Sequence, residues 1–66
     1  MVFGKGDNVR VVRVVWTQEG WKEAWQPRMT ESVNKIFVVT DSQEGHGIEL
    51  DNGYWYPASA LEMVYQ

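Results

Sequence analysis

Residues 47–57 read GIELDNGYWYP, and this stretch decides how the C-terminal half of the chain folds. Ile48 and Leu50 alternate with charged residues, which is typical of a strand with one buried face. Asn52-Gly53 follows, and this pair is the strongest short-range signal for a β-hairpin, because both central positions of a type I′ turn need positive φ. We therefore predict two antiparallel strands joined by a two-residue turn.

The length of that turn determines which of three consecutive aromatic rings faces the core. With two residues in the loop, Leu50 lies opposite Trp55 and Glu49 lies opposite Tyr56. Directly opposed residues point to the same face of a sheet. We therefore expect Trp55 in the core, and Tyr54 and Tyr56 on the outer face beside carboxylates.

Strands are also expected on both sides of this hairpin. Pro57 lacks an amide hydrogen and would end the ladder, residues 58–60 suit a 3₁₀ turn, and residues 61–65 form a last short strand. Earlier in the chain, residues 8–16 (NVRVVRVVW) and 33–40 (VNKIFVVT) are rich in β-branched side chains, which favour strands.

The first of these runs has a mixed pattern. Val9 and Val11 share one face of a strand, whereas Val12, Val14 and Trp16 share the other. Either both faces are partly covered, or a β-bulge near residues 11 and 12 re-aims the strand. We expect the indole of Trp16, like that of Trp55, to fill the core, because a barrel this small needs large side chains.

A long segment, TQEGWKEAWQPRMTES, separates the first two strands. Trp21 and Trp25 are spaced i, i+4 and would share one face of a helical turn, while Gly20 and Pro27 prevent a longer helix. We expect a long loop with one helical turn at most. The two tryptophans serve either as a lid over the core or as a surface for a partner, and the sequence leaves both open.

Composition excludes several classes of protein and site. We expect residues 1–66 to form one domain, without disulfides or the usual zinc sites, because the chain has no cysteine and only one histidine. We predict no cofactor. The net charge of −3 argues against general nucleic-acid binding. Met1-Val2-Phe3 is too short for a signal peptide and no apolar run could span a membrane, so a cytoplasmic location is the simplest.

The order of elements resembles an SH3-like β-barrel: five short strands, a long loop after the first, a tight hairpin, and a 3₁₀ turn before the last strand. The chain resembles small SH3-like barrels of bacteriophages more closely than true SH3 domains, and more distantly resembles Mind-bomb-type SH3-like domains. The matching residues are Gly6-Asp7, Val9 to Val12, Trp21 or Trp25, Met29, Asn52 to Pro57 and Leu61-Glu62. The acidic-aromatic segment of true SH3 domains is missing, so recognition of PxxP peptides is not implied. The resemblance implies a fold rather than an activity.

No pattern in the chain indicates an enzyme. His46 lies between glycines in a predicted turn, where a histidine is typically solvated, and a general base needs a partner and an enclosing pocket. No serine lies in a nucleophile elbow, and Asp41 and Glu44 do not have the spacing of a calcium loop. Gly4 and Gly6 lack the lysine and the following helix of a phosphate loop.

We therefore predict a non-catalytic protein-interaction module. Its candidate binding residues are Trp21, Trp25, Tyr54 and Tyr56, because exposed aromatic rings are typical of binding surfaces. Rings bordered by carboxylates suit a basic or proline-rich segment of another protein. If the protein is encoded by a phage, this partner is a host protein and the location is the host cytoplasm.

Two alternatives stay open. An RNA- or DNA-binding barrel would need its basic residues to converge on one face, namely Arg10, Arg13, Arg28 and Lys35. A structural homo-oligomer would instead bury Tyr54 and Tyr56 in its own interface. Mimicry of DNA is a weak third possibility, because mimics usually carry a much denser negative charge than −3.

Overall fold

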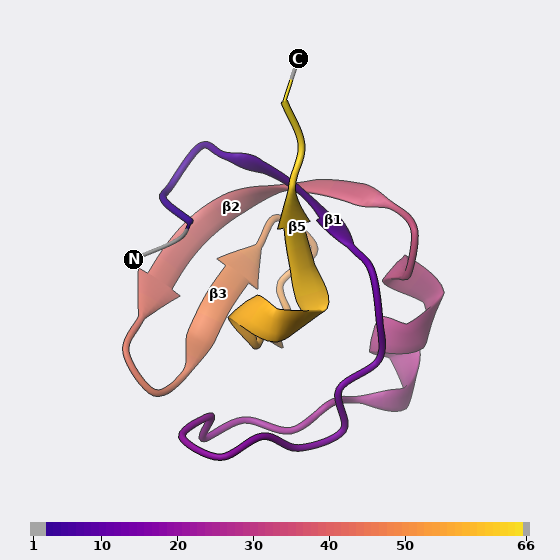
Figure 1. Ribbon diagram of the computed structural model, residues 1–66, viewed down its shortest axis with the longest axis vertical. Coiled ribbons are helices and arrows are strands. Elements are labelled where there is room, and N and C mark those ends of the chain that lie inside the picture. Colours follow the sequence, from indigo (N-terminus) through magenta and orange to yellow (C-terminus); the bar gives the residue numbers. More distant parts are fainter. Residues whose placement is uncertain (1–2, 66) are drawn as a thin grey trace.

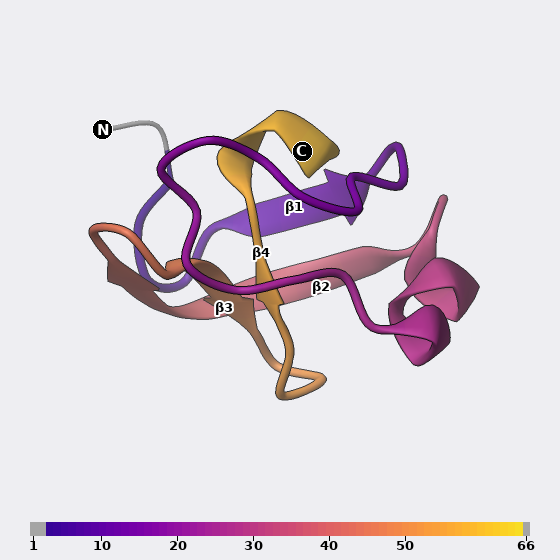
Figure 2. The same cartoon turned by 90° about the horizontal axis from the view of Figure 1, so that it is seen from below.

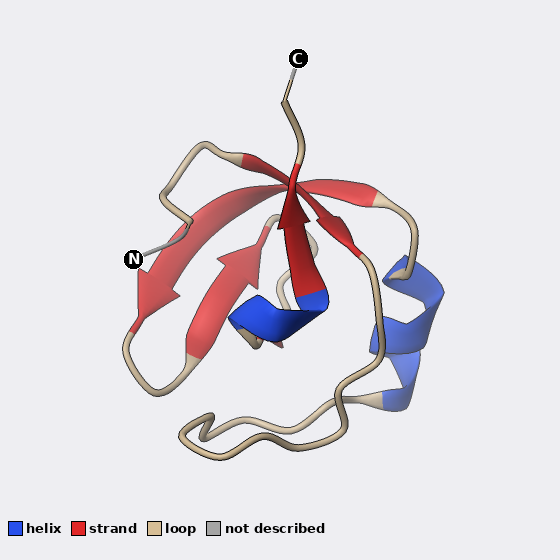
Figure 3. Cartoon of the chain, viewed as in Figure 1, coloured by secondary structure: helices blue, strands red, loops and turns tan. Residues whose placement is uncertain are grey.

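The computed structural model describes residues 3–65. Met1 and Val2, on which the prediction about a signal peptide partly depends, lie outside the described residues. Most of its regular structure is one antiparallel five-stranded sheet (Figures 1 and 3). The strands are β1 (Asn8–Val11), β2 (Ile36–Gln43), β3 (Gly47–Leu50), β4 (Trp55–Tyr56) and β5 (Leu61–Met63). Two 3₁₀ helices complete the fold, η1 (Pro27–Ser32) and η2 (Ala58–Ala60).

The sheet has the order β4-β3-β2-β1-β5, so β4 and β5 form its two edges. A small all-β fold is confirmed, as is the 3₁₀ turn at residues 58–60. The sheet bends strongly along β2 (Figure 1), but no ladder joins β4 to β5 within residues 3–65. The barrel is therefore not closed by backbone pairing.

The first strand is shorter than predicted, which explains its mixed pattern. It ends at Val11, because the amide of Val12 leaves the ladder and donates to the carbonyl of Ala60 at 2.8 Å. Val9 and Val11 are fully buried, and the conflicting residues after them belong to a loop. A bulge near residues 11 and 12, one of the two alternatives for this pattern, is absent from the strand; the ladder that shifts its register is the one between β2 and β3, between Val39 and Asp41.

The hairpin between β3 and β4 has a three-residue loop, not the predicted two-residue loop. Gly53 has φ of 87° and its amide donates to the carbonyl of Leu50 at 2.9 Å, while the amide of Leu50 donates to the carbonyl of Tyr54. This is the loop length in which a glycine in the left-handed region follows a type I turn. The register is consequently Glu49 opposite Trp55.

This one-residue difference reverses the predicted faces of the aromatic residues, because side chains alternate along a strand. Tyr56 is 0% exposed, so its predicted outward orientation is wrong. Trp55 is half-buried and lies beside Glu49 on the opposite face of the sheet, so its predicted core position is wrong as well. Tyr54 is half-buried and packs against the core rather than projecting into solvent.

The buried ring of Tyr56 joins three parts of the molecule. Trp25 meets it edge-to-face, with 5.5 Å between the ring centroids. Its hydroxyl accepts a hydrogen bond from Nδ2 of Asn52 at 2.9 Å and lies 2.8 Å from Oγ of Ser32. Ser32 donates its own hydrogen to the carbonyl of Met29, so the Tyr56 hydroxyl donates to Ser32 and is fully satisfied.

Residues 12–26 form a loop that crosses one end of the sheet and covers it (Figures 1 and 2); we call it the Trp loop. No helical turn forms at Trp21 and Trp25; the helical element of the long segment between β1 and β2 is η1, which begins at Pro27, whose fixed φ suits a first helical turn. Trp21 and Trp25 are both buried, as a lid over the core requires. Trp16 is 58% exposed, so its predicted core position is wrong, because β1 ends before it.

Candidate functional site

A cleft of about 730 Å³ lies beside the Trp loop. Four buried apolar side chains reach it from different parts of the chain. They are Phe3, Trp21, Ile48 and Pro57. The rest of the lining comes from Gly4, residues 18–20 of the Trp loop, the end of β2 and the turn after it (residues 42–45), Gly47 of β3, and Ala58 of η2. The cleft thus offers an apolar floor between three loops.

Hydrogen bonds hold the Trp loop against the β2–β3 turn on one side of this cleft. The amide of Lys22 donates to the carbonyl of Gly45 at 2.6 Å, and Nε1 of Trp21 donates to the carbonyl of His46 at 2.7 Å. Nδ1 of His46 lies 2.7 Å from Oε2 of Glu23. We call these three contacts the clasp. Together they hold the wall of the cleft in place without regular secondary structure.

Gly47 allows the cleft wall to approach β4 closely. Its φ is 101°, a conformation that side chains of L-residues rarely adopt. A Cβ at this position would overlap the carbonyl oxygen of Tyr56 and lie 3.1 Å from Nε1 of Trp21. Glycine is therefore required here for the Trp21 hydrogen bond and the β3–β4 pairing to coexist.

The rim of the cleft is acidic. Glu19 and Glu44 are exposed members of its lining, and neither is in a salt bridge within residues 3–65. No lysine or arginine lines the cleft, and the side chain of Lys22 packs over Gly45 of the lining. The open cleft therefore presents negative charge around an apolar floor.

Asp41 lies one residue before the segment that lines the cleft. Its pKa is lowered because Nε2 of Gln43 donates to its carboxylate at 3.0 Å and the amide of Ser42 donates at 2.8 Å, and the charge of Lys5 adds to the effect. These contacts hold the last residues of β2, two of which, Ser42 and Gln43, line the cleft.

A second, smaller hollow of about 140 Å³ lies where the Trp loop meets the β3–β4 hairpin. Its lining combines the carboxylate of Glu23 with two half-buried rings, Tyr54 and Trp55, and with Ala24, Gln26, Met29 and Gly53. The ring of His46 lies 6.2 Å from that of Trp55, centroid to centroid. Because Glu23 and His46 belong to the clasp, the clasp lies between the two hollows.

Comparisons with protein families, curated proteins and solved structures found no match. Within residues 3–65, no helix is long and apolar enough to cross a membrane, and no group of three acidic, histidine or cysteine side chains is placed to hold a metal ion.

The four candidate binding residues have separate places in the structure. Trp21 lines the cleft, and Tyr54 lines the smaller hollow. Trp25 and Tyr56 pack against each other in the core, and Nε1 of Trp25 donates to Oγ1 of Thr30. The group therefore does not form one exposed surface.

Other lining residues had no sequence signal of their own. Phe3 and Pro57 are apolar residues near a turn, and nothing in their neighbourhood indicates a cleft. The contact between Glu23 and His46 joins residues 23 positions apart, so only the closing of the Trp loop onto the β2–β3 turn brings them together. The glycines on both sides of His46 were the one available hint that this turn closely approaches other backbone.

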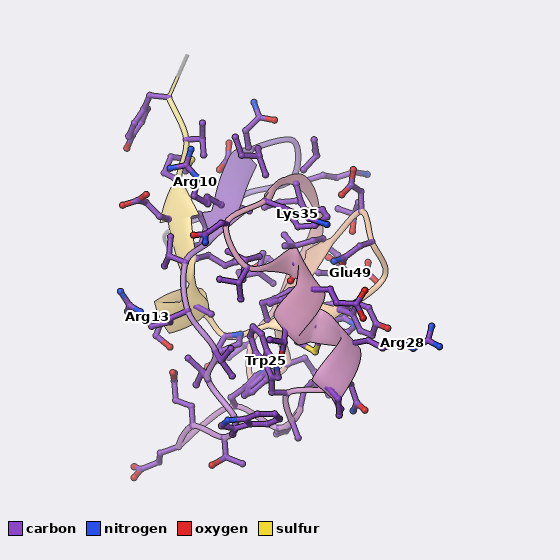
Figure 4. All side chains as sticks on the ribbon, turned by 90° about the vertical axis from the view of Figure 1, so that its right-hand side faces the viewer. Arg10, Arg13, Trp25, Arg28, Lys35 and Glu49 are labelled. Atoms are coloured by element: carbon purple, nitrogen blue, oxygen red, sulfur yellow. The ribbon has the colours of Figure 1, made fainter. Side chains whose placement is uncertain are left out.

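The basic residues considered for nucleic-acid binding do not converge. Figure 4 shows Arg10 and Arg13 along one edge of the molecule and Arg28 projecting from the other, with Lys35 between them. Arg10 lies 3.6 Å from the carboxylate of Glu62, and Arg13 donates to a backbone carbonyl in η2. The described chain therefore presents no concentrated basic patch on this face.

Proposed function

We propose that this protein is a non-catalytic protein-interaction module, built as a small SH3-like barrel, whose cleft binds a short segment of another protein. The observation that carries the proposal is the cleft itself: four buried apolar side chains at its floor, an acidic rim, and a wall held by the clasp. Its volume of about 730 Å³ lies within the range of ordinary ligand sites, about 300–1,000 Å³.

The clasp supports the binding proposal. Nδ1 of His46 contacts Glu23 and its carbonyl accepts from Trp21, so both contacts hold the Trp loop against the β2–β3 turn. A wall that is already ordered lowers the entropic cost of binding, because fewer groups must be immobilised when the partner arrives. The cleft is thus suited to recognise a short, extended segment.

The acidic rim determines the chemistry of the partner that we propose. An apolar side chain of the partner enters the cleft, and lysine or arginine residues next to it face Glu19 and Glu44. Complementary charge at an exposed rim mainly accelerates association and selects among partners. The sequence resemblance to bacteriophage barrels makes a host protein in the host cytoplasm the partner that we propose.

The proposed SH3-like architecture is supported by that resemblance and by the order of elements. A long loop follows β1, a tight hairpin joins β3 to β4, and η2 directly precedes β5. These are the features on which the resemblance depends, and β5 pairs with β1, so the first and last strands lie side by side.

Selection of peptides from a displayed random library, followed by ¹H–¹⁵N shift mapping, tests the binding proposal. We expect enriched peptides to carry an apolar residue next to a basic one, and to shift the signals of Gly20, Gly45 and the Trp21 indole. The double variant Glu19→Lys/Glu44→Lys should bind these peptides about three- to tenfold more weakly.

The matched control is Glu31→Lys/Asp51→Lys, which makes the same change of net charge at two exposed carboxylates outside the cleft lining. This control should bind as the wild type does. Equal loss in both variants, or shifts confined to the outer face of the sheet, would contradict the proposal.

Self-association is a second candidate function, favoured by a different observation. Ile36 and Val38 are 51% and 38% exposed and lie together on the outer face of β2, opposite Arg10 and Asn8 of β1. Sedimentation velocity at rising concentration separates the two candidates. A monomer throughout excludes a homo-oligomer, and a dimer lost in Ile36→Lys supports one. Retention on heparin that weakens steeply with salt would instead support nucleic-acid binding.

A further inference from the structure

The smaller hollow differs in chemistry from the cleft. Three of its lining groups can attract a cation, namely the carboxylate of Glu23 and the rings of Tyr54 and Trp55. Both rings are half-buried, so they are held in place yet remain accessible. A carboxylate and aromatic rings around one hollow are typical of sites that bind organic cations.

A second carboxylate lies near the hollow. Glu49 lies directly opposite Trp55, so its carboxylate is on the same face of the sheet as the indole. Oε2 of Glu23 is engaged by His46, whereas Oε1 has no hydrogen-bond partner within residues 3–65. No lysine or arginine lines the hollow, and Arg28 of the adjacent η1 projects away from the molecule (Figure 4). The hollow therefore has a free acceptor and no cation of its own chain in its lining.

We propose that this hollow is a binding site for an arginine side chain of a partner protein. A guanidinium group is planar, stacks on aromatic rings and donates several hydrogen bonds, so it can contact the indole of Trp55 while donating to Oε1 of Glu23. A hollow of about 140 Å³ accommodates one side chain and not a longer segment. This site is separated from the cleft by the clasp, and the proposal does not require the cleft to bind anything.

Titration of ¹⁵N-labelled protein with Nα-acetyl-arginine methylamide tests the proposal. The neutral isostere Nα-acetyl-citrulline methylamide keeps the shape of the side chain and removes its charge. We expect the arginine probe to shift the Trp55 indole and the Tyr54 amide, and the citrulline probe to bind about three- to tenfold more weakly. The corresponding lysine probe should bind more weakly than arginine, because an ammonium cannot stack.

Two variants and a control place the site. Glu23→Gln should weaken binding of the arginine probe about threefold or more. Trp55→Leu should weaken it as well, while leaving the carboxylate of Glu23 in the clasp. Glu31→Gln removes the same charge from η1 outside the hollow and should bind as the wild type does. If Glu23→Gln does not fold, the affinity of Trp55→Leu for the arginine probe alone tests whether the smaller hollow is the site.

Three results would overturn the proposal. They are equal binding of the arginine and citrulline probes, shifts centred on the Trp21 indole instead of the Trp55 indole, and a loss in Glu31→Gln as large as that in Glu23→Gln. The first would show that charge is not recognised, the second that the site is the cleft, and the third that the attraction is only to the net charge of the protein.

Discussion

At the scale of single residues, one position in the hairpin loop reverses the faces of three aromatic rings. The DNG sequence of residues 51–53 correctly predicts a turn, but it is compatible with a loop of two or of three residues. The three-residue form lets the side chain of Asn52 reach the hydroxyl of Tyr56, which is a contact between side chains that no local pattern reveals. This is why the turn could be predicted from sequence and its register could not.

The buried hydroxyl of Tyr56 gives the first prediction. Tyr56→Phe keeps the ring and removes the group that Asn52 and Ser32 contact, so both lose a partner. We expect the free energy of unfolding, measured in urea, to fall by about 1–3 kcal/mol. Tyr65→Phe is the control, because that ring is largely exposed and its loss of a hydroxyl should change little. Equal stability of Tyr56→Phe and wild type would show that Tyr56 is not buried.

Gly47 gives the second prediction. Gly47→Ala combines a strained positive φ with overlap between the new Cβ and the carbonyl of Tyr56. We therefore expect the free energy of unfolding, measured in urea, to fall by about 2–4 kcal/mol. Gly6→Ala is the matched control, since Gly6 has a similar φ of 94° and open space around its Cβ direction. That variant should lose only about 1–2 kcal/mol. A reversed order of the two losses would contradict the described approach of β3 to β4.

At the scale of elements, the strands and η2 were predictable because their signals are local: β-branched runs, a turn pair and a proline. The Trp loop was not, because its conformation depends on contacts with the distant β2–β3 turn. The spacing of Trp21 and Trp25 resembles a helical face, yet both residues belong to a loop without helical structure. Both indoles are buried, and each donates a hydrogen bond to another segment of the chain. The cleft could not be predicted for the same reason.

The clasp gives the third prediction. Trp21→Phe keeps an aromatic ring on the cleft floor but removes the hydrogen bond to the carbonyl of His46. We expect the amide of Lys22, which donates to Gly45, to exchange with solvent faster, and stability to fall by about 1 kcal/mol. Trp16→Phe should leave this exchange rate unchanged, because that indole is exposed. Unchanged exchange in Trp21→Phe would show that the clasp does not order the loop.

The end of β2 gives the fourth prediction, which concerns pH. The pKa of Asp41 is lowered in the folded state by Gln43, so its ionised form stabilises the fold at pH values above its unfolded pKa, and this stabilisation is lost as pH falls through the folded pKa. Gln43→Met removes the first donor and should raise the pKa of Asp41, as measured by carboxyl ¹³C titration. A titration curve identical to that of the wild type would contradict the contact.

At the scale of the whole molecule, the described part of a 66-residue chain without cysteine folds around one small β-sheet, and a loop completes its core. Small domains bury a limited share of their surface, so the lid supplied by Trp21 and Trp25 is part of the core and not an accessory. The same closure leaves hollows on both sides of the clasp. Stability and the proposed recognition surface therefore depend on the same loop.

The most direct test of this account is ¹⁹F NMR of protein labelled with 5-fluorotryptophan, titrated with a library-selected peptide. The four signals are assigned by single Trp→Phe variants. We predict that the peptide shifts the Trp21 signal, because that ring lines the cleft, and leaves the exposed Trp16 signal in place. A shift of Trp16 with Trp21 unmoved would contradict the proposal that the cleft is the binding surface.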